Sequence, residues 1–188
     1  MPSLSLDDAK RDLRVEIRRK VPAPGTPAHL AASVAAQERL ASSPLARAAR
    51  TVGLYRALPS ECGTASLAAA LQSLGKELCY PAVVAGAMQF RRVSGVFVRG
   101  ALGIEEPTGA AVDLAAIDLL IVPAIAVDAR GRRLGRGKGF YDLALTRYAA
   151  VSVALVFDAQ LVSEVPVGEH DRPVAWVCTD ARLLKAAP

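Results

Sequence analysis

The residues best suited to chemistry form one basic, glycine-rich stretch, RLGRGKGFYD, at positions 133–142. Its three glycines permit backbone conformations in which successive N–H groups converge on an anion. A helix expected to begin near Tyr141 would add the positive end of its dipole. Four cationic side chains would surround the bound anion: Arg132, Arg133, Arg136 and Lys138. These features together predict a polyphosphate cradle, and a solvent-exposed basic hairpin is the alternative interpretation.

Two familiar phosphate-binding motifs do not fit this stretch. A Walker A loop needs GxxxxGK[ST], but Arg132 lies five positions before Gly137, and Lys138 is followed by Gly139. The dinucleotide fingerprint needs GxGxxG, whereas this loop reads GxGxG. The pattern therefore argues against both a P-loop NTPase and a dinucleotide-dependent dehydrogenase.

The stretch ends in an acid, Asp142. A carboxylate beside bound phosphates suits Mg²⁺, which prefers one or two carboxylates together with phosphate oxygens and water. The alternative is an acid near a helix start, which the helix dipole favours without any metal. The sequence pattern leaves both interpretations open.

The elements that must position this loop alternate between helices and strands. Apolar residues recur every four positions in the N-terminal segment, where Ser5 is a candidate N-cap, and Thr26–Pro27 is typical of a second helix start. We expect helices at 6–20, from 27 to about 42, from 65 to a stop at Gly75, and at about 141–148. We expect strands at 51–58, 77–81, 117–123, 151–157 and 174–179, a pair of extended segments at 88–93 and 95–100, and a loop at 102–109.

This order predicts an α/β fold: a three-layer α/β/α arrangement around a mostly parallel, mixed central sheet. It is Rossmann-like but lacks the dinucleotide fingerprint. The glycine loop follows the strand predicted at 117–123, so it should lie at the carboxyl ends of the strands, where such sheets bind ligands. We expect residues 1–188 to form one domain.

Composition narrows the class of protein. The formal net charge of +5 favours polyanionic partners, either nucleic acid, an anionic membrane or small phosphorylated ligands. The three cysteines form no CxxC pair, and the two histidines lack metal-ligand spacing, so a zinc site is not expected. The charged N-terminal segment does not resemble a signal peptide, and no apolar run is long enough to span a membrane. We therefore expect a soluble, cytoplasmic protein.

RLGRGKGFYD, preceded by IVPAIAVDARG, resembles the signature of the 5-formyltetrahydrofolate cyclo-ligase family, also called 5,10-methenyltetrahydrofolate synthetases. Short matches follow in the family's order: KRDLR near the N-terminus, SECGT, GIEEP and EVPVGEHDRPV. The resemblance implies an ATP- and Mg²⁺-dependent enzyme that cyclises 5-formyltetrahydrofolate to 5,10-methenyltetrahydrofolate. ADP and phosphate would be released through a phosphorylated formyl intermediate.

The resemblance also implies site residues, including two from the N-terminal helix whose basic stripe would otherwise be interpreted as a solvated face. It implies nucleotide contacts from Lys10, Arg14, Arg133, Leu134, Gly135, Arg136, Gly137, Lys138, Gly139, Phe140 and Tyr141. It implies substrate contacts from Leu58, Glu61, Arg136, Lys138 and Phe140, and Mg²⁺ ligands at Asp142 and Asp171.

Two other functions stay open from the sequence. One is a non-catalytic homologue that binds nucleotide or RNA, and the other is an enzyme acting on a different phosphorylated metabolite. The cations gather at one loop and one helix face, and aromatic residues are few, which disfavours nucleic acid. The presence of both Asp142 and Asp171 favours an enzyme over a protein that only binds its ligand. We expect a monomer that acts on a small-molecule substrate and binds neither nucleic acid nor membrane.

Overall fold

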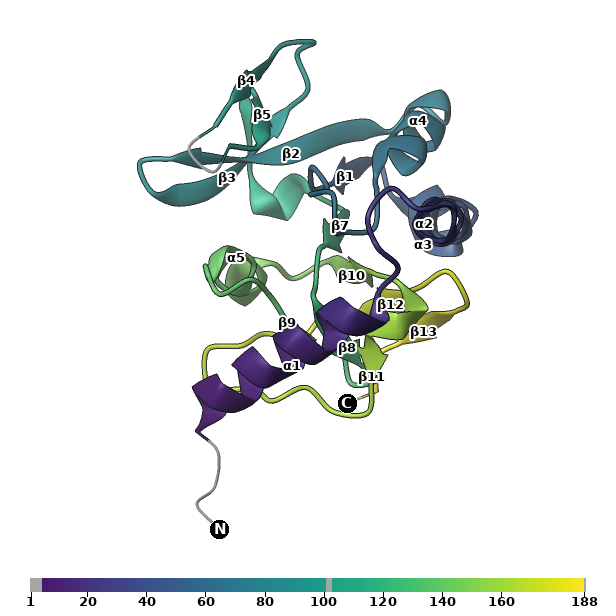
Figure 1. Cartoon of the computed structure of the whole chain (residues 1–188). Helices are drawn as coiled ribbons and strands as arrows, with labels where there is room; N and C mark the ends of the chain where they lie inside the picture. The colour runs from purple at the N-terminus through teal and green to yellow at the C-terminus, as the bar shows by residue number, and fades with distance from the viewer. Residues whose placement is uncertain (1–4, 101–102, 188) are drawn as a thin grey trace.

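The computed structural model describes residues 5–100 and 103–187 (Figure 1). The helices are α1 (Leu6–Lys20), α2 (Pro27–Ala41), α3 (Pro44–Ala48), α4 (Ala65–Ser73) and α5 (Phe140–Arg147). The strands are β1 (Thr51–Gly53), β2 (Glu77–Val84), β3 (Ala87–Arg92), β4 (Phe97–Arg99), β5 (Glu105–Pro107), β6 (Ala111–Val112), β7 (Leu119–Val122), β8 (Ala126–Asp128), β9 (Arg133–Leu134), β10 (Val151–Leu155), β11 (Leu161–Val162), β12 (Trp176–Cys178) and β13 (Leu183–Lys185).

The central sheet has eight strands in the order β13-β12-β10-β7-β1-β2-β3-β6. The five strands from β12 to β2 pair in parallel with their neighbours within that run. The outer strands β13, β3 and β6 pair antiparallel. The predicted mixed, mostly parallel sheet is therefore confirmed.

Side chains on the central strands alternate between two cores, because successive residues of a strand face opposite sides of the sheet. Leu119 and Ile121 of β7 pack in a cluster with residues of α2 and α4. Leu120 and Val122 pack in a second cluster with Leu145 of α5. Figure 1 shows α2, α3 and α4 on one side of the sheet and α5 on the other. This arrangement confirms the three-layer architecture.

Two smaller sheets extend the central one. Strands β11, β8 and β9 form a three-stranded sheet, on which α1 packs through Ile17 against Ala126, Leu134 and Val165. Strands β4 and β5 form a hairpin that projects beyond β2 and β3, at the top of Figure 1. The first small sheet places the basic N-terminal helix beside the glycine loop, because β9 leads directly into that loop.

The helix starts agree with their sequence signals, but two expectations about extended segments were wrong. Ser5 and Thr26 cap α1 and α2 by accepting hydrogen bonds from the backbone N–H of the third residue of each helix, Asp8 and His29. The strand expected at 51–58 ends at Gly53, after which the chain leaves the sheet and Tyr55 bonds the Cys62 carbonyl. The loop expected at 102–109 contains β5, because residues 105–107 pair with β4; residues 101 and 102 lie outside the described range.

The extended segments at 88–93 and 95–100 do not pair with each other. The first, β3, pairs with β2 and β6, and the second, β4, pairs with β5. The three cysteines are buried and free, and burial raises their pKa values to about 12, so they serve as packing residues. Among the residues that the structure describes, no helix combines the length and apolar character needed to cross a membrane.

A buried carboxylate fixes the chain just before the glycine loop. Asp128, 1% exposed, accepts hydrogen bonds from the backbone N–H groups of Arg130, Arg132 and Val165. It also pairs with the Arg132 guanidinium at 2.6 Å. This set of bonds ties β8 to the start of β9 and to the later segment at Val165.

We predict that Asp128→Asn lowers the free energy of unfolding by about 2–4 kcal/mol, because an amide cannot replace a buried anion that accepts four hydrogen bonds. Urea unfolding followed by circular dichroism measures this loss. Glu164→Gln is the matched control, since Glu164 pairs with the same Arg132 but is largely exposed. We expect the control to change stability by less than about 0.5 kcal/mol. Equal effects of the two substitutions would contradict this account of Asp128.

Candidate functional site

A cavity of about 720 Å³ lies where the segments after β1 and β7 meet the glycine loop. Its wall includes residues of α1, β2, α5 and the segment at 170–172. It is lined by every site residue that the family resemblance implies: Lys10, Arg14, Leu58, Glu61, Arg133, Leu134, Gly135, Arg136, Gly137, Lys138, Gly139, Phe140, Tyr141, Asp142 and Asp171. The structure thus brings together positions that are up to 161 residues apart in the chain.

The glycine loop turns sharply into α5. Gly137 and Gly139 have φ values of +94° and +70°, in the left-handed region that favours glycine. Gly139 is the residue that caps the N-terminus of α5. Arg14 donates from Nε to the Gly135 carbonyl at 3.1 Å and so holds the loop against α1. Arg136 and Lys138 are exposed beside the cavity, where an anion could reach them.

One cation predicted to surround the loop lies elsewhere. Arg132 pairs with Asp128 and Glu164 and is not among the cavity's lining residues. Its neighbour Arg133 begins β9 and points to the opposite side, as successive strand residues do. The expectation for Arg132 was therefore wrong. Arg18, which follows Lys10 and Arg14 at the same four-residue spacing on α1, is exposed and also does not line the cavity.

Arg133 is a buried cation in the cavity wall. Its side chain is 3% exposed and pairs with Asp142 at 2.8 Å between Nη2 and Oδ1. Burial lowers the pKa of Arg133, while the nearby Asp142 carboxylate opposes that change. Its Nε and the Tyr141 hydroxyl are buried without a hydrogen-bond partner in the described residues. Both unsatisfied groups are donors, and both residues line the cavity.

The two acids proposed as metal ligands lie close together. Asp142 Oδ1 accepts a hydrogen bond from the backbone N–H of Arg172, the residue directly after Asp171. Asp171 accepts from the Gly168 N–H at 2.6 Å and pairs with Lys10 at 2.5 Å. Partial burial pushes the pKa of Asp171 upward, but the Gly168 N–H and Lys10 outweigh it, so the pKa falls below its usual value. Asp171 is therefore ionised at neutral pH.

These carboxylates fit the requirements of Mg²⁺. They supply hard oxygen ligands beside a cationic loop, which matches a metal held by two carboxylates and substrate phosphates. In the described parts of the chain, no three His, Cys, Asp or Glu side chains gather into a complete metal site of their own. Any ion here would depend on oxygens from a bound ligand.

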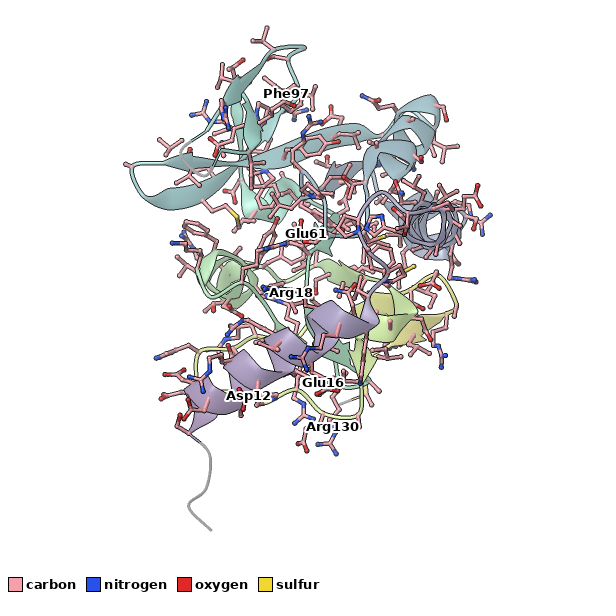
Figure 2. All side chains as sticks on the ribbon, viewed as in Figure 1. Asp12, Glu16, Arg18, Glu61, Phe97 and Arg130 are labelled. Carbon is pink, nitrogen blue, oxygen red and sulfur yellow. The ribbon has the colours of Figure 1, made fainter. Side chains whose placement is uncertain are left out.

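The substrate side of the cavity begins at the loop after β1. Glu61 accepts from the Leu58 N–H at 2.8 Å and pairs with Arg136 at 2.9 Å, linking this loop to the glycine loop. Figure 2 places Glu61 near the middle of the molecule. Gly63 instead donates its N–H to Ser33 of α2, and a Cβ there would lie 2.9 Å from that hydroxyl. Glu61 is thus the member of the SECGT segment that lines the cavity.

Several lining residues were not singled out from the sequence. Pro81 and Val83 share one face of β2 and form part of an apolar wall, and their alternation was a usable signal. Met88 and Ile104 extend that wall. Glu106 and His170 also reach the cavity, and both lie in segments, GIEEP and EVPVGEHDRPV, whose resemblance to the family was a usable signal.

Comparisons with known proteins all lead to one family. The sequence profile of the 5-formyltetrahydrofolate cyclo-ligase family matches residues 7–180. A 5-formyltetrahydrofolate cyclo-ligase of Mycolicibacterium smegmatis is 36% identical over 149 residues, covering 73% of this chain and 77% of that protein. One from Escherichia coli K12 is 33% identical over 159 residues, covering 79% and 87% respectively.

Solved structures give the same result. The NMR structure of the Aquifex aeolicus 5,10-methenyltetrahydrofolate synthetase superimposes with a TM-score of 0.84 at 27% identity, covering 95% of this chain and 93% of that one. A synthetase from Mycoplasma pneumoniae shares the fold, with a TM-score of 0.74 at 19% identity and coverage of 91% and 98%. The profile match, the relatives and the fold together establish that this chain belongs to the 5-formyltetrahydrofolate cyclo-ligase family of enzymes.

Proposed function

We propose that this chain catalyses the ATP- and Mg²⁺-dependent cyclisation of 5-formyltetrahydrofolate to 5,10-methenyltetrahydrofolate. One observation carries the proposal: a single cavity joins the cationic glycine loop, two adjacent carboxylates and an apolar wall. The first two suit a nucleotide with its metal, and the third suits a flat organic ring. The family membership supports the same reaction.

The proposed chemistry converts a poor leaving group into a good one. The formyl oxygen attacks the γ-phosphorus of ATP, the bond to the bridging oxygen breaks, and ADP leaves. Nitrogen N10 then attacks the activated formyl carbon and loses its proton. The carbon–oxygen bond breaks, and phosphate departs with the former formyl oxygen. The products are 5,10-methenyltetrahydrofolate, ADP and phosphate.

In this scheme the chain positions the two substrates and neutralises the negative charge of the phosphoryl group. Arg136 and Lys138 offer exposed cations to the phosphoryl group, and the N-terminus of α5 offers backbone N–H groups. Arg14 fixes the loop through Gly135. Asp142 and Asp171 would hold Mg²⁺, which supplies positive charge to the transferring phosphoryl group when bound. The paired acids favour this enzyme over a binding-only homologue. We also propose that the protein acts as a cytoplasmic monomer.

We predict that Lys138→Ala and Asp142→Ala each lower kcat/KM by about 100-fold or more, because each removes charge from the phosphoryl-transfer site. An absorbance assay for 5,10-methenyltetrahydrofolate, with ATP and Mg²⁺ supplied or omitted, measures this. Arg130→Ala is the control, since Arg130 is an exposed cation of the same segment that does not line the cavity. Arg130 is labelled near the bottom of Figure 2. Wild-type turnover without ATP would contradict the proposal.

We further predict that the metal ion binds weakly until a nucleotide is present, because Lys10 and Arg133 already neutralise the two acids. Lys10→Met should therefore strengthen binding of the metal alone by about tenfold, or about 1.4 kcal/mol. Electron paramagnetic resonance of free Mn²⁺ measures this affinity without any turnover.

Lys20→Met is the matched control for that experiment, because Lys20 pairs with Glu16 on the same helix and does not line the cavity. We expect its metal affinity to equal that of the wild type. An unchanged or weaker affinity in Lys10→Met would show that the Lys10–Asp171 pair does not compete with the metal.

A further inference from the structure

A second carboxylate faces the substrate side of the cavity without a role in the scheme above. Glu106 on β5 lines the cavity and is 9% exposed. Its neighbour Glu105 points the other way, is exposed, and pairs with Arg56. Within residues 5–100 and 103–187, no hydrogen bond or ion pair reaches the Glu106 carboxylate. A carboxylate in so largely buried a position is stabilised by hydrogen bonds, which a ligand in the cavity can supply.

The hairpin that carries Glu106 is fixed to the main sheet. The Phe97 ring of β4 meets Tyr80 of β2 edge-on, with ring centroids 6.0 Å apart. The Arg56 guanidinium lies 4.8 Å from the centre of the same Phe97 ring. Figure 2 labels Phe97 on this hairpin. Because Val98 pairs with Glu106 in the two-stranded ladder, these contacts also set the position of Glu106.

A glycine holds the carboxyl group in place. A Cβ added at Gly100 would lie 2.1 Å from both Cδ and Oε1 of Glu106, so the carboxyl packs directly against the bare backbone. The Gly100 N–H donates to the Ile104 carbonyl at 2.8 Å and closes the turn beside it. The side chain is therefore fixed at the cavity wall.

The surroundings point to a flat ligand with two adjacent donors. Apolar residues line the same part of the cavity: Pro81, Val83, Met88 and Ile104. The pyrimidine edge of a pterin ring presents a 2-amino group and an N3–H side by side. A carboxylate accepts two such parallel hydrogen bonds, as it does from a guanidinium. The ring itself would pack against the apolar residues.

We propose that Glu106 accepts both hydrogen bonds from this edge and selects the pterin of the folate substrate. This inference rests on the proposed function. It adds a second carboxylate to the substrate side of the cavity, in addition to Glu61, which contacts the Leu58 N–H and Arg136.

The test is a double-mutant cycle between protein and ligand, measured as equilibrium binding in the presence of ADP and Mg²⁺. The ligands are 5-formyltetrahydrofolate and its analogue without the 2-amino group. We expect the wild type to bind the analogue about 10- to 100-fold more weakly. Glu106→Gln should bind the parent ligand about 10- to 100-fold more weakly and distinguish the two ligands by less than about threefold. A purely structural role would leave that discrimination intact.

Two further variants sharpen the result. Glu77→Gln, whose exposed side chain pairs with Arg92 outside the cavity, should behave like the wild type. Gly100→Ala keeps Glu106 but displaces its carboxyl group, and should weaken binding as Glu106→Gln does. Equal wild-type affinity for the two ligands would overturn the inference while leaving the proposed function standing. This comparison uses only the wild-type protein, so it does not depend on whether a variant folds. Absence of wild-type binding to 5-formyltetrahydrofolate would overturn the proposed function itself.

Discussion

Burial of the Arg133 guanidinium is the constraint on which the site depends. A buried cation is strongly unfavourable unless an anion lies against it, and Asp142 is that anion. Asp142 is held in turn by the N–H of Arg172, which brings the preceding Asp171 to the same place. Asp171 then pairs with Lys10 from the other end of the chain. The ion pairs and hydrogen bonds that begin at Arg133 thus hold β9, α5, α1 and the segment at 168–172 around a single cavity.

The same pairs explain how the cavity can stay compact without its ligands. Its acids and cations neutralise one another: Lys10 with Asp171, Arg133 with Asp142, and Arg136 with Glu61. Binding a polyphosphate and a divalent ion would exchange these internal pairs for external ones. Such an exchange would conserve the number of charge contacts while changing their partners, which suits the proposed reaction.

The fold supplies two unlike walls for this cavity. The parallel strands deliver the segments after β1 and β7 to one edge of the sheet, where α/β folds commonly bind ligands. The antiparallel extension through β2 and the β4–β5 hairpin adds the apolar wall and Glu106. Polar phosphate chemistry and recognition of a flat ring can therefore occur side by side.

Sequence patterns predicted the central sheet well because buried strands and capped helices have local signals. The continuous apolar run that includes Leu119–Val122 and the N-cap at Ser5 are examples. The glycine loop was also predictable, since its glycines and cations are contiguous. Pairings between distant segments were not. Arg132 and Arg133 look equivalent in sequence. They differ because their side chains point to opposite sides of the chain at β9, so that only Arg133 lines the cavity. Glu106 lay in a segment expected to be a loop, so its orientation had no local signal.

In the proposed reaction, phosphoryl transfer to the formyl oxygen precedes ring closure. Turnover of 5-formyltetrahydrofolate carrying ¹⁸O in its formyl group, with mass analysis of the released phosphate, tests it directly. The account predicts that the label appears in inorganic phosphate, because the formyl oxygen leaves bonded to phosphorus. Label recovered in water, with unlabelled phosphate, would contradict it.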